Sequence, residues 1–237
     1  MTFKRARTEE QVDLRLKSIR KTAAALYDTK GIAGVTFAQV AAIAGLTRPA
    51  LYSYFDNRYD LIFDLLTEEF RILNSALKAR LNALETDEPS ADLLARTLSS
   101  EISAHRRFAS LLVLCIGTFN QVSEKMVEKF KECSTEFSAL LVSHLQRLKF
   151  RISRIEADKY AAAVYSAVLG TCASYYGEAI IKSECFASED SMSEYPDYEE
   201  DLFFMIGLLT SGLLIKNRKQ PTIKQAFSKV LDLDSFL

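Results

Sequence analysis

The stretch that decides the fold is residues 31–61, GIAGVTFAQVAAIAGLTRPALYSYFDNRYDL. Thr36 is placed to cap a short helix whose apolar face carries Val40, Ala41, Ile43 and Ala44. Gly45 and Leu46 then supply a turn, since glycine can reverse the chain there without a Cβ clash. Thr47 can cap a second short helix, which carries Leu51, Tyr52, Tyr54 and Phe55.

Two short helices joined by a turn that contains glycine form a helix-turn-helix, which lays its second helix in a DNA major groove. We expect a preceding helix, from about residue 9 to residue 30, to complete a three-helix domain over residues 1–57. The predicted core of this domain is apolar and consists of Val40, Ile43, Leu46, Leu51 and Phe55.

In these residues the chain resembles the TetR family of bacterial transcriptional regulators. The apolar face and terminal glycine of that family's first helix match Ile19, Ala23, Leu26, Tyr27 and Gly31. Its further signature matches Thr36, Val40, Ala41, Ala44-Gly45, Leu46-Thr47, Leu51-Tyr52, Tyr54-Phe55 and Leu61. Two places depart from it, because Pro49 replaces a frequent glycine and Asn57-Arg58 replaces Ser-Lys. Proline is tolerated in a first helical turn, and arginine keeps the positive charge.

The resemblance implies an all-α fold in two parts. Residues 1–57 would form an N-terminal three-helix helix-turn-helix DNA-binding domain, and residues 58–237 an α-helical ligand-sensing and dimerisation domain. The charge distribution agrees with this division, although the whole chain has a net charge of only −1. Residues 1–58 carry ten Lys and Arg against five Asp and Glu, a net charge of +5, and the remainder has a net charge of −6.

Exposed polar side chains of the helix-turn-helix are the candidate DNA contacts. Gln39, Arg48 and Ser53 are predicted to reach base edges, Arg48 because its guanidinium can bond both acceptors of guanine. The hydroxyl and basic side chains predicted to contact phosphates are Thr36, Thr47, Tyr52, Tyr54 and Arg58. In the resembled family, the matching tyrosines and the basic residue at the start of the fourth helix serve this phosphate role.

A basic arm, Lys4, Arg5 and Arg7, precedes the first helix. It could lie along phosphates or in the minor groove, as homeodomain arms do. The alternative interpretation is a charged terminus without a binding role.

The rest of the chain is predicted to be helical, with only four prolines and eight glycines in all. The expected helices cover about 58–84, 92–105, 108–119, 123–149, 155–183 and 202–217, with a short amphipathic segment at 223–231. Residues 184–201 hold eight acids and are expected to form a solvated loop, either a connector or a gate.

Specific DNA binding by a single helix-turn-helix buries little surface, so a homodimer that reads an inverted repeat is expected. By resemblance, the last two long helices would pair with those of a second copy. Small residues in the first would allow close approach: Ala161, Ala162, Ala163, Gly170, Ala173, Ser174 and Gly177. The second offers an apolar surface made of Leu202, Met205, Ile206, Leu209 and Leu213. The alternative is that both helices belong to the core of a monomer.

The resemblance also implies a small-molecule effector that binds among the middle helices and releases the protein from DNA, which makes a repressor the default expectation. Aromatic and apolar residues there favour an apolar or aromatic effector: Phe108, Leu112, Phe119, Phe130, Phe137, Tyr165 and Tyr175. The alternative is that these residues belong to the core, since an aromatic stripe at helical spacing is more often core than pocket.

Other classes of function are disfavoured by the composition. Four cysteines stand far apart with no CxxC pair, and there are only two histidines, so no metal, cofactor or disulfide framework is expected. An enzyme is not expected either, because no constellation of acid, base and nucleophile and no glycine-rich phosphate loop is present. The N-terminus lacks an apolar signal core, and the longest apolar run has fourteen residues, which predicts a cytoplasmic protein without a membrane span. A helical protein-interaction module that does not bind DNA specifically remains the alternative function.

Overall fold

The computed structural model describes residues 8–84, 90–147, 152–181 and 198–217, which are helical and contain no strand. The N-terminal elements are α1 (Glu9–Gly34), α2 (Phe37–Ala44) and α3 (Arg48–Leu51). The remaining elements are α4 (Arg58–Ala83), α5 (Ala91–Ala104), α6 (Arg106–Ile116), the 3₁₀ helix η1 (Phe119–Gln121), α7 (Glu124–Arg147), α8 (Arg154–Ile181) and α10 (Tyr198–Asn217). The predicted all-α fold is confirmed.

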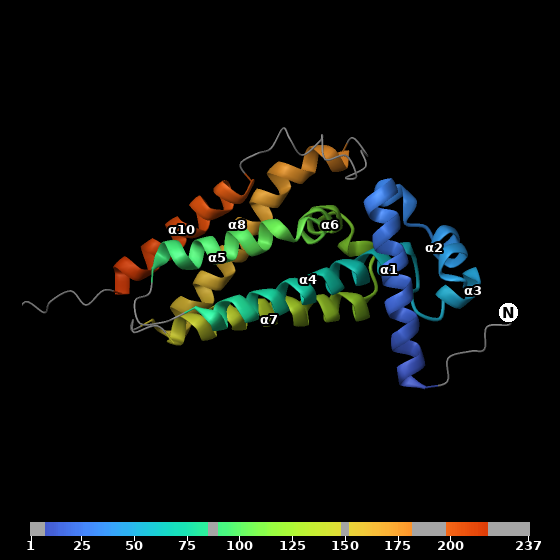
Figure 1. Ribbon diagram of the computed structural model, residues 1–237, viewed down its shortest axis with the longest axis horizontal. Coiled ribbons are helices and arrows are strands. Elements are labelled where there is room, and N and C mark those ends of the chain that lie inside the picture. Colours follow the sequence, from blue (N-terminus) through green and yellow to red (C-terminus); the bar gives the residue numbers. More distant parts are fainter. Residues whose placement is uncertain (1–7, 85–89, 148–151, 182–197, 218–237) are drawn as a thin grey trace, which may run out of the picture.

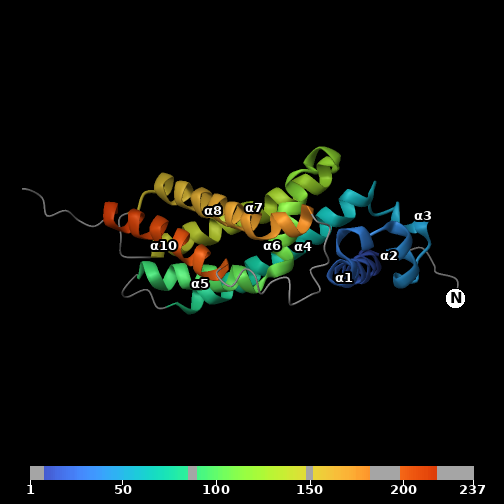
Figure 2. The same ribbon diagram turned by 90° about the horizontal axis from the view of Figure 1, so that it is seen from above.

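The first three helices gather at one end of an elongated molecule (Figure 1). There α1 runs across the end of the longer helices, and α2 and α3 lie on its outer side (Figures 1 and 2). Helix α4 runs from this end into the body and packs against α7, while α10 packs against α5 and α8. Among the described residues, no helix combines the length and the apolar character that a membrane crossing requires.

Helix α4 is the central element of the core. It packs against α1, α5, α6 and α7, so that every residue from Leu61 to Thr67 is buried. Burial on all sides explains why its first half reads as nearly continuous apolar sequence rather than as one stripe. Because α4 also starts directly behind the helix-turn-helix, it connects that unit mechanically to the body.

Helix ends differ from the sequence-based expectations at α1, α6 and α10, and α6 runs from Arg106 to Ile116 instead of over 108–119. Helix α1 extends to Gly34, with a bend at Gly31, whose φ of 60° lies in the region that favours glycine. Helix α10 begins at Tyr198, so the expectation that the acidic loop runs to residue 201 is wrong for its last residues. The acids of the first turn of α10, Glu199, Glu200 and Asp201, lie where carboxylates stabilise a helix dipole. Residues 184–197, the basic arm and the segment 223–231 lie outside the described residues.

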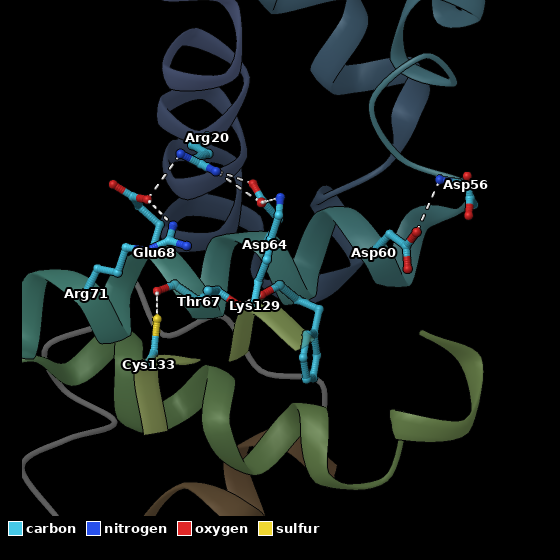
Figure 3. Close-up of polar contacts among 10 residues, drawn as sticks. Arg20, Asp56, Asp60, Asp64, Thr67, Glu68, Arg71, Lys129 and Cys133 are labelled. Atoms are coloured by element: carbon cyan, nitrogen blue, oxygen red, sulfur yellow. Dashed lines mark hydrogen bonds and ion pairs between the residues drawn. The ribbon is translucent and has the colours of Figure 1, made fainter. Parts of the chain in front are cut away.

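Ion pairs tie α1 to the body. The buried carboxylate of Asp64 on α4 accepts a hydrogen bond from Nε of Arg20 on α1 at 2.7 Å (Figure 3). Nζ of Lys129 on α7 lies 3.7 Å from the other carboxylate oxygen of Asp64. Arg107 at the start of α6 contacts Asp28 of α1 at 2.7 Å and Glu69 of α4 at 2.6 Å. Its hydrogen bond to Asp28 is the main cause of the raised pKa of Arg107. The angle between α1 and the body is therefore fixed by charge-assisted bonds as well as by apolar packing.

Candidate nucleic-acid interface

Residues at the ends of α2 and α3 determine the local structure of the helix-turn-helix. The Thr36 hydroxyl accepts the Gln39 N–H at 3.2 Å and so begins α2. Gly45 ends α2 in the left-handed conformation, with φ 66° and ψ 32°, and Leu46 N–H donates to the Ala41 carbonyl at 2.8 Å. Thr47 stands at the N-cap position of α3 but its side chain makes no capping hydrogen bond, so that part of the prediction is wrong. Pro49 follows in the first turn, where proline lacks only an N–H that would have no helical partner.

The second helix of the motif is shorter than predicted. Helix α3 covers only Arg48–Leu51, whereas the sequence indicated a helix of about two turns that continued through Phe55. The N–H groups of Ala50, Ser53 and Tyr54 each bond to the carbonyl three residues earlier, which is the pattern of tight turns and 3₁₀ segments. This tighter winding buries Phe55 and leaves Tyr52 exposed.

The core of the motif differs from prediction at one residue. Val40, Leu51 and Phe55 are buried, and Leu46 is half-buried against them. Ile43 is 64% exposed, so its assignment to the core is wrong. The physical reason is the geometry of α2, which turns its Phe37, Val40 and Ala41 side toward the core and leaves Ile43 on the outside.

Four of the predicted DNA contacts are exposed on the outer side of this unit: Thr47, Arg48, Tyr52 and Ser53. The guanidinium of Arg48 has no hydrogen-bond or ion-pair partner within the described parts of the chain. The ring of Tyr52 packs edge-on against Phe37 at 5.0 Å, which fixes the direction of its hydroxyl. Ser53 donates to the Ala50 carbonyl at 2.7 Å, so its oxygen remains available as an acceptor.

Three further predicted contacts, Thr36, Gln39 and Tyr54, are half-buried. The Thr36 hydroxyl is engaged in its cap, and the Tyr54 ring packs against the core. The carbonyl oxygen of Gln39 is buried and finds no hydrogen-bond partner within the described residues, which is a costly state for an acceptor.

Arg58 is the first residue of α4, as expected, but its guanidinium is bonded to the backbone of this chain. Its Nε donates to the Val35 carbonyl at 2.8 Å, and its Nη2 donates to the Ile32 carbonyl. Both carbonyls belong to the end of α1 and the turn after it, so Arg58 closes that helix from α4. A phosphate contact through its remaining N–H groups stays a prediction.

Sequence reasoning missed two polar residues directly behind the motif. The Asn57 side-chain oxygen accepts the Asp60 N–H at 3.0 Å and caps α4, and the buried Asp60 carboxylate accepts the Asp56 N–H at 3.2 Å. Figure 3 shows the Asp60 side chain beside Asp56. The spacing Asn-x-x-Asp at a helix start was the signal that could have indicated this double cap.

The residues predicted to line an effector site come together only in part. Five of them form an aromatic cluster around Phe70 and Phe63 of α4, with ring centroids 4.8–6.5 Å apart: Phe108, Phe119, Phe130, Phe137 and Tyr165. Leu112 is buried on α6. Tyr175 lies apart from the cluster, because its hydroxyl donates to Asp201 at 2.5 Å between α8 and α10.

The predicted dimer residues also separate into two groups. Leu202 and Ile206 are fully buried within this chain, so their side chains cannot form the surface that meets a second copy, and that expectation is corrected. The exposed residues are Ala162, Gly170, Ala173 and Met205, and the half-buried ones are Gly177, Leu209 and Leu213. The sequence argument missed the most exposed apolar side chains of α10, which are Phe204, Leu208 and Ile215.

A surface groove of about 460 Å³ runs between α8 and α10. Its wall on α8 is made of small residues that include Ala167 and Gly170, and its other wall carries Phe204 and Met205. No group of three or more His, Cys, Asp and Glu residues that could hold a metal ion occurs among the described residues.

Comparison with known proteins agrees with this geometry. Residues 19–65 match the model of the bacterial regulatory proteins of the tetR family. No match to a curated protein was found.

Among solved structures, a TetR-family transcriptional regulator from Streptomyces coelicolor is similar, with 14% identity and a TM-score of 0.55 over 85% of this chain and 96% of that one. SmeT, the repressor of the Stenotrophomonas maltophilia multidrug efflux pump SmeDEF, has 15% identity and a TM-score of 0.53 over 83% and 89% of the chains. FadR from Bacillus subtilis, in complex with stearoyl-CoA, has 15% identity and a TM-score of 0.51 over 83% and 98%. At these identities the likeness concerns the fold. Residues 19–65 thus match the tetR family of bacterial regulatory proteins, and the chain shares its all-α fold with solved TetR-family transcriptional regulators.

Proposed function

We propose that this protein is a sequence-specific DNA-binding transcriptional regulator, a homodimeric repressor that a small apolar or aromatic effector releases from its operator. The observation that carries the proposal is the exposed set Thr47, Arg48, Tyr52 and Ser53 on a rigid helix-turn-helix. An unpaired guanidinium flanked by hydroxyl groups suits recognition of guanine edges and phosphates. The match of this segment to the tetR family supports the same function.

Dimerisation is supported by the surface of the last two helices. The exposed side of α8 carries small residues such as Ala162 and Gly170, and the exposed side of α10 carries Phe204 and Leu208. Adjacent small and large residues on one surface are self-complementary, which is what a two-fold interface requires. A dimer would place two readers about one DNA turn apart on an inverted repeat.

Effector binding is supported by the aromatic cluster and by one orphan acceptor beside it. Asn74 lies one helical turn after Phe70 and is 1% exposed. Its amide nitrogen donates to the Cys133 carbonyl at 2.9 Å and to Glu136 at 3.3 Å, which fixes the orientation of the amide. The Asn74 oxygen therefore points away from α7, and it has no hydrogen-bond partner in the part of the chain that the structure describes. An effector with an aromatic body and one hydrogen-bond donor would satisfy this oxygen.

DNA selection is the experiment that tests the function. The purified protein selects from a random duplex pool at about 150 mM salt, and the recovered sequences are read. Recovery of an inverted repeat is the expected result. Failure to enrich any sequence would contradict the proposal and would favour the protein-interaction module.

A variant pair then links DNA binding to the proposed surface. Arg48→Ala should weaken operator binding by about 1–3 kcal/mol and relax specificity at one base pair. The matched control is Arg80→Ala, which removes an exposed arginine of α4 in the body and should leave the affinity unchanged. Equal effects of the two substitutions would show that Arg48 does not read DNA.

A further inference from the structure

The turn between α6 and α7 is bonded directly to the end of the helix-turn-helix. The Asp60 carboxylate accepts the Ser123 N–H at 2.8 Å through one oxygen and the Asp56 N–H at 3.2 Å through the other. Asn57 donates from its amide nitrogen to the Gln121 carbonyl at 3.0 Å. Residues 56 and 57 follow the exposed reader residues by only three or four positions, so the turn is attached close to the DNA-contacting surface.

These bonds are positioned to transmit force. Asp60 is 1% exposed and makes no ion pair within the described residues, so the two backbone N–H groups are what satisfies its charge. Hydrogen bonds to an ionised acceptor are short and strong, and a buried carboxylate that loses one is left unsatisfied. A displacement of Ser123 should therefore carry Asp60 and Asp56 with it rather than break the contact.

The same turn also reaches the aromatic cluster. Phe119, the first residue of η1, packs against Phe63 at 5.1 Å and against Phe130 at 6.2 Å. Its ring is 40% exposed, whereas Phe63 and Phe130 are buried. Phe119 is thus the outermost ring of the cluster, and the one that a molecule entering the cluster can move with least loss of packing.

We propose that residues 117–123 form the transmission element between the effector site and the DNA reader, with Asn57 and Asp60 as positioning residues. A molecule that displaces Phe119 shifts η1, and the bonds from Gln121 and Ser123 move the turn at residues 56–57 and the reader before it. This assignment rests on the proposed function for its DNA readout, but the mechanical link itself does not require DNA.

The other joints between α1 and the body favour this route. Arg20 binds Asp64 (Figure 3). Arg107 binds Asp28 and Glu69, so α1 is held to α4 and α6 by charge-assisted bonds. These bonds fix the inner half of the helix-turn-helix domain. The turn at residues 56–57 lies beyond them. It is attached to η1 and the turn after it through Asn57 and Asp60, and Arg58 next to it bonds the Val35 and Ile32 carbonyls, so a shift of η1 acts on the reader together with the end of α1.

A double-mutant cycle tests the link on the full chain. Asn57→Ser keeps an oxygen that can cap α4 but removes the amide donor to Gln121. Phe119→Leu removes the ring from the cluster. We expect each single substitution to change the Kd for the selected duplex at least threefold. In the double variant the change in Kd should be smaller than the product of the two single changes by a factor of at least three. Single effects that multiply within a factor of two would overturn the proposal.

Hydrogen exchange gives a readout that does not depend on DNA. In the wild-type background, Phe119→Leu should raise amide exchange at least threefold in residues 52–57 as well as in 117–123. In the Asn57→Ser background, which keeps the bond between Asp60 and Ser123, the response at 52–57 should fall to less than half. An unchanged response there would overturn the link. If no duplex is ever selected but this pattern is found, the function has failed and the link stands.

Asn120→Ser is the matched control. Asn120 is exposed in the same 3₁₀ helix and makes no bond within the described residues, so the substitution is chemically the same but leaves the joint intact. It should behave as wild type in both measurements. The melting temperatures of all variants are compared first. If exchange at residues 52–57 rises in Asn120→Ser as it does in Asn57→Ser, and follows only a lowered melting temperature, the proposal is overturned.

Discussion

At the scale of single residues, Asp64 shows how this fold uses a buried charge. Its carboxylate is 1% exposed and lies between Arg20 of α1 and Lys129 of α7. A buried ion pair adds little net stability over an apolar pair of the same volume, but the loss of one partner leaves the others uncompensated. Such a site specifies the relative placement of three helices more than it stabilises them.

Asp64→Ala should therefore destabilise the protein by up to about 3 kcal/mol, because Arg20 loses its buried partner and keeps only the partly exposed Glu68, and Lys129 loses the carboxylate beside it. Urea unfolding followed by circular dichroism measures the change. Asp158→Ala is the control, since Asp158 pairs with Arg154 on the exposed side of α8, where a pair contributes at most about 1 kcal/mol. Similar losses for both variants would contradict the structural role of Asp64.

Gly45 is the residue whose backbone makes the turn of the helix-turn-helix. Its φ of 66° is unfavourable for residues with a Cβ, so Gly45→Ala should cost about 1 kcal/mol or more. In contrast, a Cβ at Gly207 inside α10 would meet only the Ala95 Cβ, at an ordinary contact distance of 3.8 Å. Thermal unfolding should show a lower melting temperature for Gly45→Ala and none of this loss for Gly207→Ala, because alanine is the better helix former.

Residue identities were predictable where local chemistry decided them. Thr36, Gly45 and Pro49 take the positions that capping and turn rules assign to them. Arg58 could not be placed in this way, because its partners Ile32 and Val35 are more than twenty residues earlier in the chain. Asp64 is a similar case, since its partner Arg20 is forty-four residues away.

At the scale of elements, the buried polar contacts between α8 and α10 join neutral hydroxyl and thiol groups, whereas ion pairs such as that of Arg20 with Asp64 join α1 to the body. Tyr160 lies 2.7 Å from the Thr210 hydroxyl, and the Cys172 thiol lies 3.2 Å from the Tyr198 hydroxyl. Burial raises the pKa of Tyr160 to about 12 and that of Cys172 to about 11, and it raises the pKa of Tyr198 as well. The contact is therefore stable only while these groups keep their protons.

Alkaline pH should weaken this contact. The unfolded chain ionises near pH 9 at the thiol and near pH 10 at the phenols, whereas the folded groups still hold their protons there. Their contribution to stability is complete below pH 9 and is lost as the pH rises toward 11–12. For Tyr160 the loss is on the order of 2 kcal/mol.

Urea unfolding at pH 8, 10 and 11 measures this dependence. In Tyr160→Phe the fall of the unfolding free energy between pH 10 and 11 should be smaller than in wild type. An equal fall in both proteins would show that Tyr160 does not titrate as the structure indicates.

Element boundaries were predicted best for long amphipathic helices and worst for short ones. The sequence placed α4 and α7 within about two residues, because their apolar residues recur every three or four positions. Helix α3 was predicted too long, since the choice between a further helical turn and tight turns depends on burying Phe55 in the core. The local pattern at 52–55 does not contain that information.

At the scale of the whole molecule, the exposed surface of α10 is the test of the dimer. Phe204→Glu places a charge in the proposed two-fold interface, where both copies would carry it, and should convert the dimer to a monomer at micromolar concentration. Light scattering measures the mass. Leu14→Glu is the matched control, because Leu14 on α1 has the same exposed fraction as Phe204, 62%. The Leu14→Glu variant should remain a dimer. A wild-type protein that is already monomeric would contradict the proposed assembly.

By itself, the sequence determined the class of the fold and the position of its helix-turn-helix. Caps, turns and apolar periodicity act between residues a few positions apart, so they can be read directly from residues 31–61. The tertiary structure alone decided which side chains remain on the surface and which contacts join the parts. Ile43 is exposed, Leu202 is internal, and Arg58 and Asp60 bind backbone groups of distant segments. These outcomes depend on how helices that are far apart in the sequence pack together, and no local pattern encodes that packing.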